Sequence, residues 1–278
     1  VVLRQVGGRT FSLESAGMIA GALRDELIRR HGPGAPEWLT GHPPGSAEPS
    51  RRRRPAIFPL GFVGREYADG HLLGVGIALP ADDFTPADTR LLFGLLARHD
   101  EPADVAAEGV GFVRLAVPGP ARGGVVGELL LELDERPAAR RAYALQPETW
   151  TRPACLWVTV TPAVLPRFTK KRLTAAQVIS QACVDAGYPE PVSVQTSLAP
   201  AMSGVPHARS FHRPVKSGRP PRPLTHAVLH FDGPVRGPLL LGAGRYAGFG
   251  LCRSLGCGYD EAQNVCRIGT LAQRGSRS

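Results

Sequence analysis

The chain has 278 residues, of which 43% are hydrophobic, and this length can bury one large core or two smaller ones. Its 33 lysines and arginines outnumber its 24 acidic residues, and the net charge of +9 favours a polyanionic partner such as nucleic acid. No apolar run reaches the ~18 residues of a membrane-spanning helix and no segment reads as a signal peptide, so we expect a cytoplasmic protein without a membrane partner.

Residues 1–146 predict alternating strands and helices. Strands are expected at 1–6, 56–60, 71–79, 109–117 and 125–133, and helices at 12–30 and 85–99. Ser12 is the expected N-cap of the first helix, and Thr85-Pro86-Ala87-Asp88 has the cap, proline and acid of a helix start. The order β-α-β-β-α-β, with one extra strand, is that of a ferredoxin-like unit. Because the chain begins without methionine, in what reads as mid-strand, we expect it to be part of a longer protein.

A similar unit follows the linker at 147–153. Strands are expected at 155–160, 191–197 and 226–231, with a helix that begins after Thr174 and ends at Gly187. Residues 236–241 are too few and too proline-rich for a second helix, so they lead directly into a glycine-rich loop and a last strand. The prediction is an α+β protein of two tandem ferredoxin-like (RRM-like) domains, 1–146 and 154–255, followed by a C-terminal tail at 256–278.

The glycine-rich loop is the most informative segment, with five glycines in the fourteen residues 237–250. Without a Cβ, glycine lets backbone N–H groups approach a phosphate closely, while arginine fits phosphate geometry and an aromatic ring can stack on a base. The alternative is a glycine-rich turn with a surface arginine. The residues predicted here to bind RNA are Arg236, Gly242, Gly244, Arg245, Tyr246 and Gly248.

Three further basic clusters lie in loops, at 51–54, 167–172 and 209–222. Each alone is typical of a solvated loop, but together with the glycine-rich loop they favour nucleic acid over a membrane surface. The cations predicted to bind RNA are Arg53, Arg54, Lys170, Lys171, Arg209 and Arg213. The five cysteines lack metal-binding spacing and are expected to be reduced thiols, so we predict no metal and no cofactor.

Several short segments of the sequence resemble those of one protein family. They are FPLGFVG at 58–64, DGHLLG at 69–74, WVTVTP at 157–162, GVPHARSF at 204–211, THAVLHF at 225–231 and GPLLLGAGRY at 237–246. On these segments the chain resembles the RNA-processing endoribonucleases of CRISPR systems, in the repeat-associated RNA-binding (RAMP) superfamily. It is most similar to the processing half of the fused subunit of type I-U (also called I-G) systems. The resemblance covers roughly residues 1–255 and is most specific in the second half.

The resemblance implies metal-independent cleavage of the repeat in precursor CRISPR RNA, in which a 2′-hydroxyl attacks the adjacent phosphate and leaves a 2′,3′-cyclic phosphate. It also implies repeat RNA and other subunits of a type I effector complex as partners. Such chemistry requires a group that titrates near neutral pH, usually histidine, and cations that stabilise the developing charge. The candidates are His42, beside the arginine run, and His207 and His212, in a basic segment expected to face the glycine-rich loop.

One departure from the family leaves cleavage open. Relatives commonly carry a histidine directly before the strand at 55–60, where this chain has Arg54, and arginine in its usual charged state cannot act as a base. The alternative is a catalytically inactive subunit that holds the guide-RNA hairpin in an effector complex. A ferredoxin-like metabolic enzyme would need an acidic or polar pocket that the sequence does not indicate. Structural roles are expected for His31, His71, His99, His226 and His230.

Overall fold

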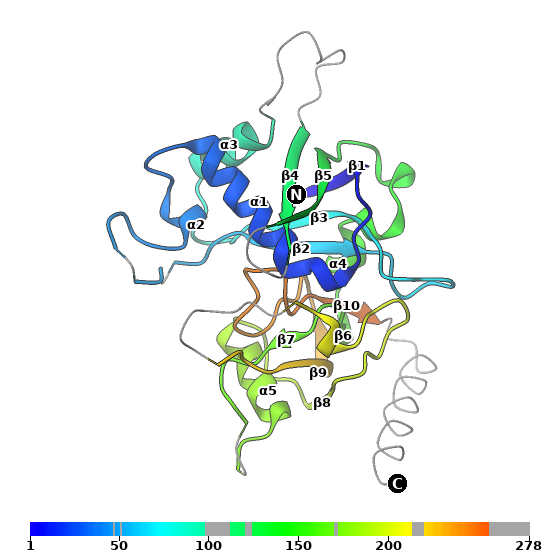
Figure 1. The fold of residues 1–278 in the computed structure, drawn as a ribbon. Coiled ribbons are helices and arrows are strands. Elements are labelled where there is room, and N and C mark those ends of the chain that lie inside the picture. Colours follow the sequence, from blue (N-terminus) through cyan, green and yellow to red (C-terminus); the bar gives the residue numbers. More distant parts are fainter. Residues whose placement is uncertain are drawn as a thin grey trace.

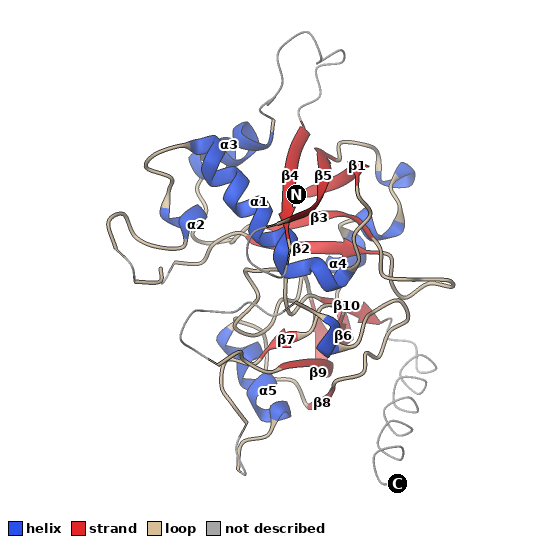
Figure 2. Ribbon diagram, viewed as in Figure 1, coloured by secondary structure: helices blue, strands red, loops and turns tan. Residues whose placement is uncertain are grey.

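The computed structural model describes residues 1–46, 48–50, 52–97, 112–119, 124–169, 172–212 and 220–255. The chain folds into an α+β structure with two antiparallel sheets, one of them curled into a half-barrel. The two sheets lie one above the other in Figure 1 and are coloured by element type in Figure 2. In the described ranges no helix is both long and apolar enough to cross a membrane. Lys170, Lys171, Arg213, His99 and the tail at 256–278 lie outside the described residues.

The first sheet has the strand order β2-β3-β1-β5-β4, and every neighbouring pair is antiparallel. Its strands are β1 (Val2–Gly8), β2 (Ala56–Gly61), β3 (Leu72–Ala78), β4 (Phe112–Pro118) and β5 (Val125–Leu133). Along β4 exposed and buried residues alternate, as expected when one face packs on a core. The five strands predicted in residues 1–146 thus correspond to β1–β5, with ends that differ by a few residues.

Helices α1 (Ala16–His31), α2 (Glu37–Thr40) and α3 (Pro86–Leu96) accompany the first sheet (Figure 1). The start of α3 is confirmed as a capping box, since the Thr85 hydroxyl accepts the Asp88 N–H at 3.1 Å and the Asp88 carboxylate accepts the Thr85 N–H at 3.0 Å. The predicted N-cap of α1 is wrong. A 3-10 turn at Leu13–Ser15 comes first, so Ser15 rather than Ser12 precedes α1.

The second sheet has the order β10-β6-β9-β7, with β8 also paired to β9. Its strands are β6 (Ala154–Thr159), β7 (Ala163–Val164), β8 (Ser193–Ser197), β9 (Leu224–Val235) and β10 (Cys252–Leu255). Helix α5 (Ala175–Asp185) has the predicted Thr174 cap, and α4 (Glu148–Thr151) lies in the linker. Further 3-10 turns are Ala138–Arg140, Tyr143–Leu145 and Ala208–Ser210. Residues 239–241, which lead into the glycine-rich loop, form no strand, and Leu240 makes only an isolated bridge with Leu251.

The two halves share a hydrophobic core. One continuous cluster joins Leu3 and Leu23 of the first half to Val158 and Phe249 of the second, all at most 1% exposed. A smaller cluster lies between the second sheet and α5, around Trp157, Ile179 and Phe231. Because complete burial of one such side chain stabilises a fold by about 2 kcal/mol, this shared core holds the second half against the first. The site described below lies where the halves meet.

Candidate nucleic-acid interface

A groove of about 270 Å³ is lined from both halves of the chain. Arg53 and Arg54 reach it from the segment before β2, Arg236 from the end of β9, and Arg245 and Tyr246 from the glycine-rich loop. We call this space the arginine-lined groove. Five residues predicted from three separate segments to bind RNA thus lie along one cavity.

Neutral groups and one carboxylate complete its lining. The Tyr188 hydroxyl donates to the Pro238 carbonyl at 2.8 Å, and burial raises the pKa of this phenol to about 12. The side chain of Asp185 accepts a hydrogen bond from Gln181 Nε2 at 2.9 Å. Tyr188 therefore stays uncharged at neutral pH. Among the described residues, the side of the groove near the end of α5 carries a carboxylate, Asp185, and no arginine.

The ring of Tyr246 organises the cations. The guanidinium carbons of Arg54 and Arg245 each lie 4.9 Å from its centroid. A cation over an aromatic face is attracted by the negative face of the ring, which offsets part of the repulsion between the two like charges. The backbone carbonyl of Tyr246 accepts a hydrogen bond from Arg24 of α1. Tyr246 therefore ties cations of three segments together.

Arg24 was not among the residues predicted from the sequence. It follows Ala20 by four residues, on the row of α1 that faces the glycine-rich loop, and this packing cannot be read from the sequence. Burial, together with a smaller effect of the charge of Arg54, lowers its pKa to about 10. Burial also lowers the pKa of Arg54, with a further contribution from Arg245. Both shifts mean that positive charge is concentrated here at some cost in energy.

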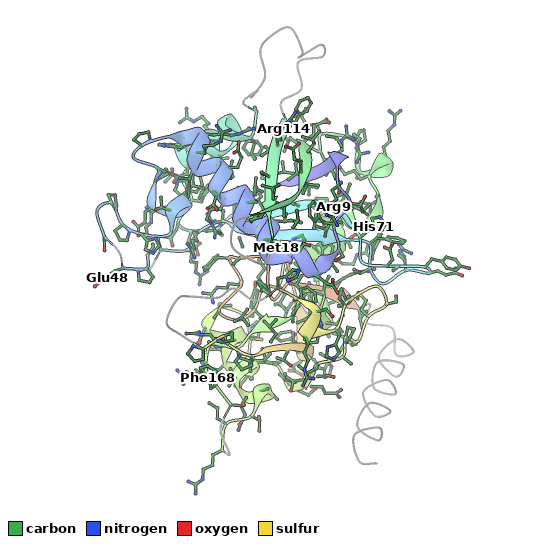
Figure 3. All side chains as sticks on the ribbon, in the orientation of Figure 1. Arg9, Met18, Glu48, His71, Arg114 and Phe168 are labelled. Carbon is green, nitrogen blue, oxygen red and sulfur yellow. The ribbon has the colours of Figure 1, made fainter. Side chains whose placement is uncertain are left out.

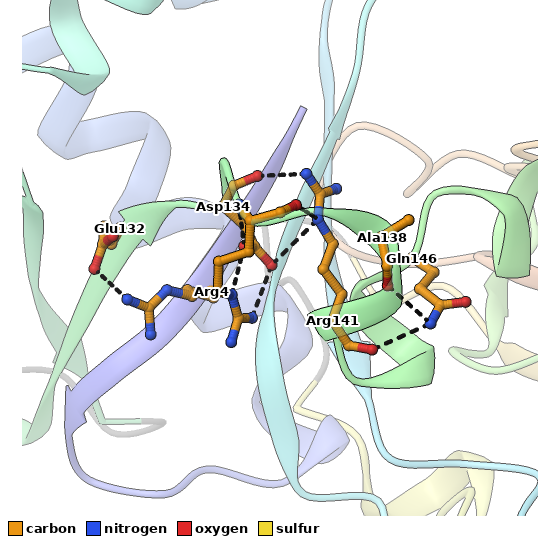
Figure 4. A network of polar contacts seen from close by, with 7 residues as sticks. Arg4, Glu132, Asp134, Ala138, Arg141 and Gln146 are labelled. Carbon is orange, nitrogen blue, oxygen red and sulfur yellow. Dashed lines mark hydrogen bonds and ion pairs between the residues drawn. The ribbon is translucent and has the colours of Figure 1, made fainter.

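Several arginines on β1 and in the segment after β5 pair with carboxylates within the protein (Figure 4). Arg136 Nε lies 2.8 Å from Asp134 Oδ1, and Arg4 Nη2 lies 2.8 Å from Glu132 Oε2. Arg141 Nε also lies 3.8 Å from Asp134 Oδ2, and the side chain of Asp134 is fully buried. By contrast, in the part of the chain that the structure describes, no carboxylate forms an ion pair with an arginine of the groove. An external anion in the groove would therefore meet arginines that are not already paired with a carboxylate of the described residues.

The glycines of the loop serve close packing. Gly242, Gly244 and Gly248 are buried, and the N–H groups of Ala243 and Ala247 donate within the protein, at 2.9 and 2.8 Å. At Gly248, where φ is +85°, a Cβ would lie 2.5 Å from the Ala16 carbonyl oxygen of α1. At Gly244 it would lie 2.6 Å from Val164 of β7. The glycines hold the loop in place, and the side chains of Arg245 and Tyr246 carry its chemistry into the groove.

None of the three candidate histidines lines the groove. His207 is exposed, and its Nδ1 accepts the Arg209 N–H at 3.2 Å at the start of a 3-10 turn. The backbone N–H of His212 donates to the Glu14 carbonyl at 3.3 Å. Of that segment, Phe211 does approach the loop, with its ring centroid 6.5 Å from that of Phe249.

His42 is the candidate histidine whose loop contacts an arginine of the groove. Its side chain is exposed, with Nδ1 3.3 Å from the Thr40 carbonyl oxygen. The preceding residue, Gly41, is buried against the guanidinium of Arg54, and a Cβ there would collide with Arg54 Nη1. The loop that carries His42 is therefore packed against a groove arginine.

Two other histidines have structural partners. His226 is 2% exposed, with Nε2 3.0 Å from the Pro206 carbonyl oxygen and Nδ1 3.0 Å from the Thr159 hydroxyl. Because a carbonyl only accepts, Nε2 carries the proton and Nδ1 accepts from the hydroxyl. Burial lowers the pKa of His226 to about 4, so the ring is neutral. His71, labelled in Figure 3, pairs with Asp69 at 2.5 Å.

The thiols and the other cations lie apart from the groove. Cys183 and Cys252 are free thiols, and burial raises the pKa of Cys183 to about 12. Arg209 is exposed and does not line the groove, and Arg253 is buried beside Val63, to whose carbonyl it donates. Over the described ranges, no three His, Cys, Asp or Glu side chains gather as metal ligands.

No protein-family model, no curated protein and no solved structure matches the chain. The short sequence segments quoted above and the arginine-lined groove are therefore the two features that bear on its function. Of these, the groove is the feature that supports a chemical class of ligand directly: it concentrates arginine and tyrosine, which suit phosphate and a nucleobase.

Proposed function

We propose that the protein binds the repeat RNA of a CRISPR system in the arginine-lined groove. The observation that carries this proposal is the convergence of Arg53, Arg54, Arg236 and Arg245 on one cavity, without a carboxylate partner among the described residues. Guanidinium groups bind phosphate oxygens through paired N–H donors, and Tyr246 adds a ring on which a base can stack. On this proposal the protein belongs to the RAMP superfamily, most like the processing half of the fused type I-U subunit.

Strand order supports two ferredoxin-like units. In the split βαβ motif of such a unit, a helix joins two strands that have a third strand inserted between them. In the first half α1 joins β1 to β2, and β3 lies between them. In the second half the chain runs from β6 through the short β7 into α5 and then into β8, and β9 lies between β6 and β8. The glycine-rich loop then stands where the second helix of that unit would otherwise come.

The activity proposed for this site is cleavage of the repeat. A 2′-hydroxyl attacks the adjacent phosphorus while its proton passes to a base, and the 5′-oxygen of the next nucleotide leaves with a proton, giving a 2′,3′-cyclic phosphate. Arginines can stabilise the charge of the phosphorane. We assign the base to His42, because its loop packs against Arg54 through Gly41. Other subunits of a type I effector complex are the proposed protein partners.

A second candidate function is RNA binding without cleavage, as a subunit that holds the guide hairpin. The specific observation in its favour is that no histidine lines the groove among the described residues. The position before β2, where relatives commonly carry histidine, is occupied by the Arg54-Pro55 pair, and this arginine stacks on Tyr246 instead.

One experiment separates the two candidates. Purified protein is incubated in EDTA with radiolabelled repeat RNA, and with a matched RNA that carries a 2′-deoxy sugar at the cleavage position. Cleavage predicts a product ending in a cyclic phosphate that is absent from the deoxy RNA and lost in His42→Ala, while His207→Ala retains it. Salt-sensitive binding without a product supports the holding subunit. Absence of salt-sensitive binding to either RNA overturns both candidates.

A further inference from the structure

An apolar pocket of about 310 Å³ adjoins the arginine-lined groove. Ala78, Leu79 and Pro238 line both cavities, so the two cavities lie side by side at the end of β3. The deeper walls of the apolar pocket include Phe58 of β2 and Trp150 of α4, which are 5% and 3% exposed. A cationic cavity thus adjoins an apolar one.

The polar atoms on these walls are already used within the protein. The indole N–H of Trp150 donates to the Ala144 carbonyl at 2.8 Å, and the Thr151 hydroxyl donates to the Pro147 carbonyl at 3.0 Å. Val1 also lines the pocket, and its N-terminal ammonium group donates to the Ile77 carbonyl at 2.9 Å. An ion or a phosphate would lose most of its hydration among these mainly apolar walls. A flat group with apolar faces loses little hydration and gains dispersion contacts.

We infer that the apolar pocket takes one unpaired nucleobase of an RNA strand whose phosphates lie in the arginine-lined groove. This inference rests on the proposed function and narrows its substrate to single-stranded nucleotides at this site. Bases that are splayed out of a strand are commonly held between aromatic or apolar side chains while cations hold the backbone. Arg54 and Arg245 in the adjoining groove favour a polyanion over an apolar peptide as the occupant, because an apolar peptide would gain nothing from those charges.

The test uses three short probes with the same backbone charge: hexauridylate, hexaadenylate and a hexamer of abasic ribose phosphates. Stacking of one base is worth about 1–3 kcal/mol, so we expect at least one base-bearing hexamer to bind roughly 5- to 150-fold more tightly than the abasic hexamer. Affinities are measured by titration of labelled probe at fixed low salt. This comparison needs no substitution and so does not depend on the folding of a variant.

Substitutions then locate the base. Thr151→Phe fills the apolar pocket from a wall that the groove does not share, and Val2→Phe fills it from β1. Each is expected to remove most of the advantage of the base-bearing hexamer and to leave the affinity for the abasic hexamer unchanged. The matched control is Thr89→Phe, because Thr89 also donates its hydroxyl to the carbonyl four residues earlier, at 3.1 Å, but lines neither cavity. Melting curves establish that each variant is folded.

The possible outcomes test the nucleobase pocket separately from the proposed binding of RNA in the groove. If no hexamer binds in a salt-dependent way, or if Arg54→Gln leaves binding unchanged, the proposed function fails and the inference fails with it. If binding depends on Arg54 but abasic and base-bearing hexamers bind equally, the inference alone is overturned. It is also overturned if the advantage of the base survives in Val2→Phe and in Thr151→Phe, since the base then lies elsewhere, for example on Tyr246.

Discussion

Replacing Arg54 by glutamine removes one positive charge from the arginine-lined groove and leaves a side chain of similar length. Arg54 is half-buried, stacks on Tyr246 and lines the groove. Because burial and Arg245 already disfavour its charged form, the loss of this charge is expected to change the melting temperature little. Its main effect should therefore be on the binding of polyanions.

The magnitude follows from counterion release. For single strands, each phosphate neutralised contributes about −0.7 to the slope of log affinity against log salt concentration. Four groove arginines on four phosphates give a slope of about −2.8, a fall in affinity of roughly 50-fold between 50 and 200 mM salt. With Arg54→Gln the slope becomes about −2.1 and the fall roughly 20-fold. Loss of one charged hydrogen bond also weakens binding by about 10- to 100-fold at fixed salt.

The assay is a titration of labelled single-stranded RNA at several salt concentrations. The matched control is Arg29→Gln, which makes the same charge change on an exposed arginine that pairs with Glu26 at 2.7 Å and does not line the groove. The control is expected to keep the slope and most of the affinity. Equal slopes for the wild type and Arg54→Gln, or equal losses in both variants, would refute the assignment of the groove as the phosphate site.

Three further predictions concern stability, and urea unfolding measures each. Because burial lowers the folded-state pKa of His226 from 6.5 to about 4, its contribution is present above pH 6.5 and is lost as pH falls toward 4, with about 2 kcal/mol lost between pH 7 and pH 5. Gly248→Ala puts a Cβ against the Ala16 carbonyl at a positive φ and is expected to cost about 2 kcal/mol or more, with weaker RNA binding because the loop shifts. Asp134→Asn leaves Arg136 without its buried partner and is expected to cost about 2 kcal/mol near neutral pH, after allowance for the partial exposure of that arginine.

Matched variants make these predictions specific. His226→Gln should lose the pH dependence between pH 7 and 5, and an unchanged slope would assign it to other groups. Gly21→Ala, in α1 where an added Cβ meets nothing within 4 Å, should stabilise the protein by about 0.5–1 kcal/mol. Burial raises the pKa of Asp134, but its hydrogen bonds with Arg136 outweigh burial and lower it overall, so this stability is present above pH about 4 and lost below it. The deficit of Asp134→Asn should shrink in acid, and a pH-independent deficit would contradict the ion pair.

Elements held by contacts between near neighbours could be predicted from the sequence. The capping boxes at Thr85 and Thr174 involve residues only three positions apart, so both helix starts were read correctly. Apolar patterning likewise located most strands of both sheets, but the two-residue strand β7 was not predicted. The start of α1 was misplaced because a 3-10 turn and the beginning of an α-helix have similar local patterns, and the bridge between Phe11–Ser12 and β3 decides between them.

The sequence predicted the residue types of the candidate site, but not which residues lie together there. Composition and glycine-rich patterning selected Arg54, Arg245 and Tyr246, which is as far as local signals reach. That Arg24 joins them, and that His207 and His212 do not line the groove, depends on how α1 packs against the loop and how the two halves share one core. Hydrophobic periodicity records which face of an element is buried, but not which distant element covers that face. Contacts between distant segments are fixed only when the whole core packs, and for this reason the groove exists only in the tertiary structure.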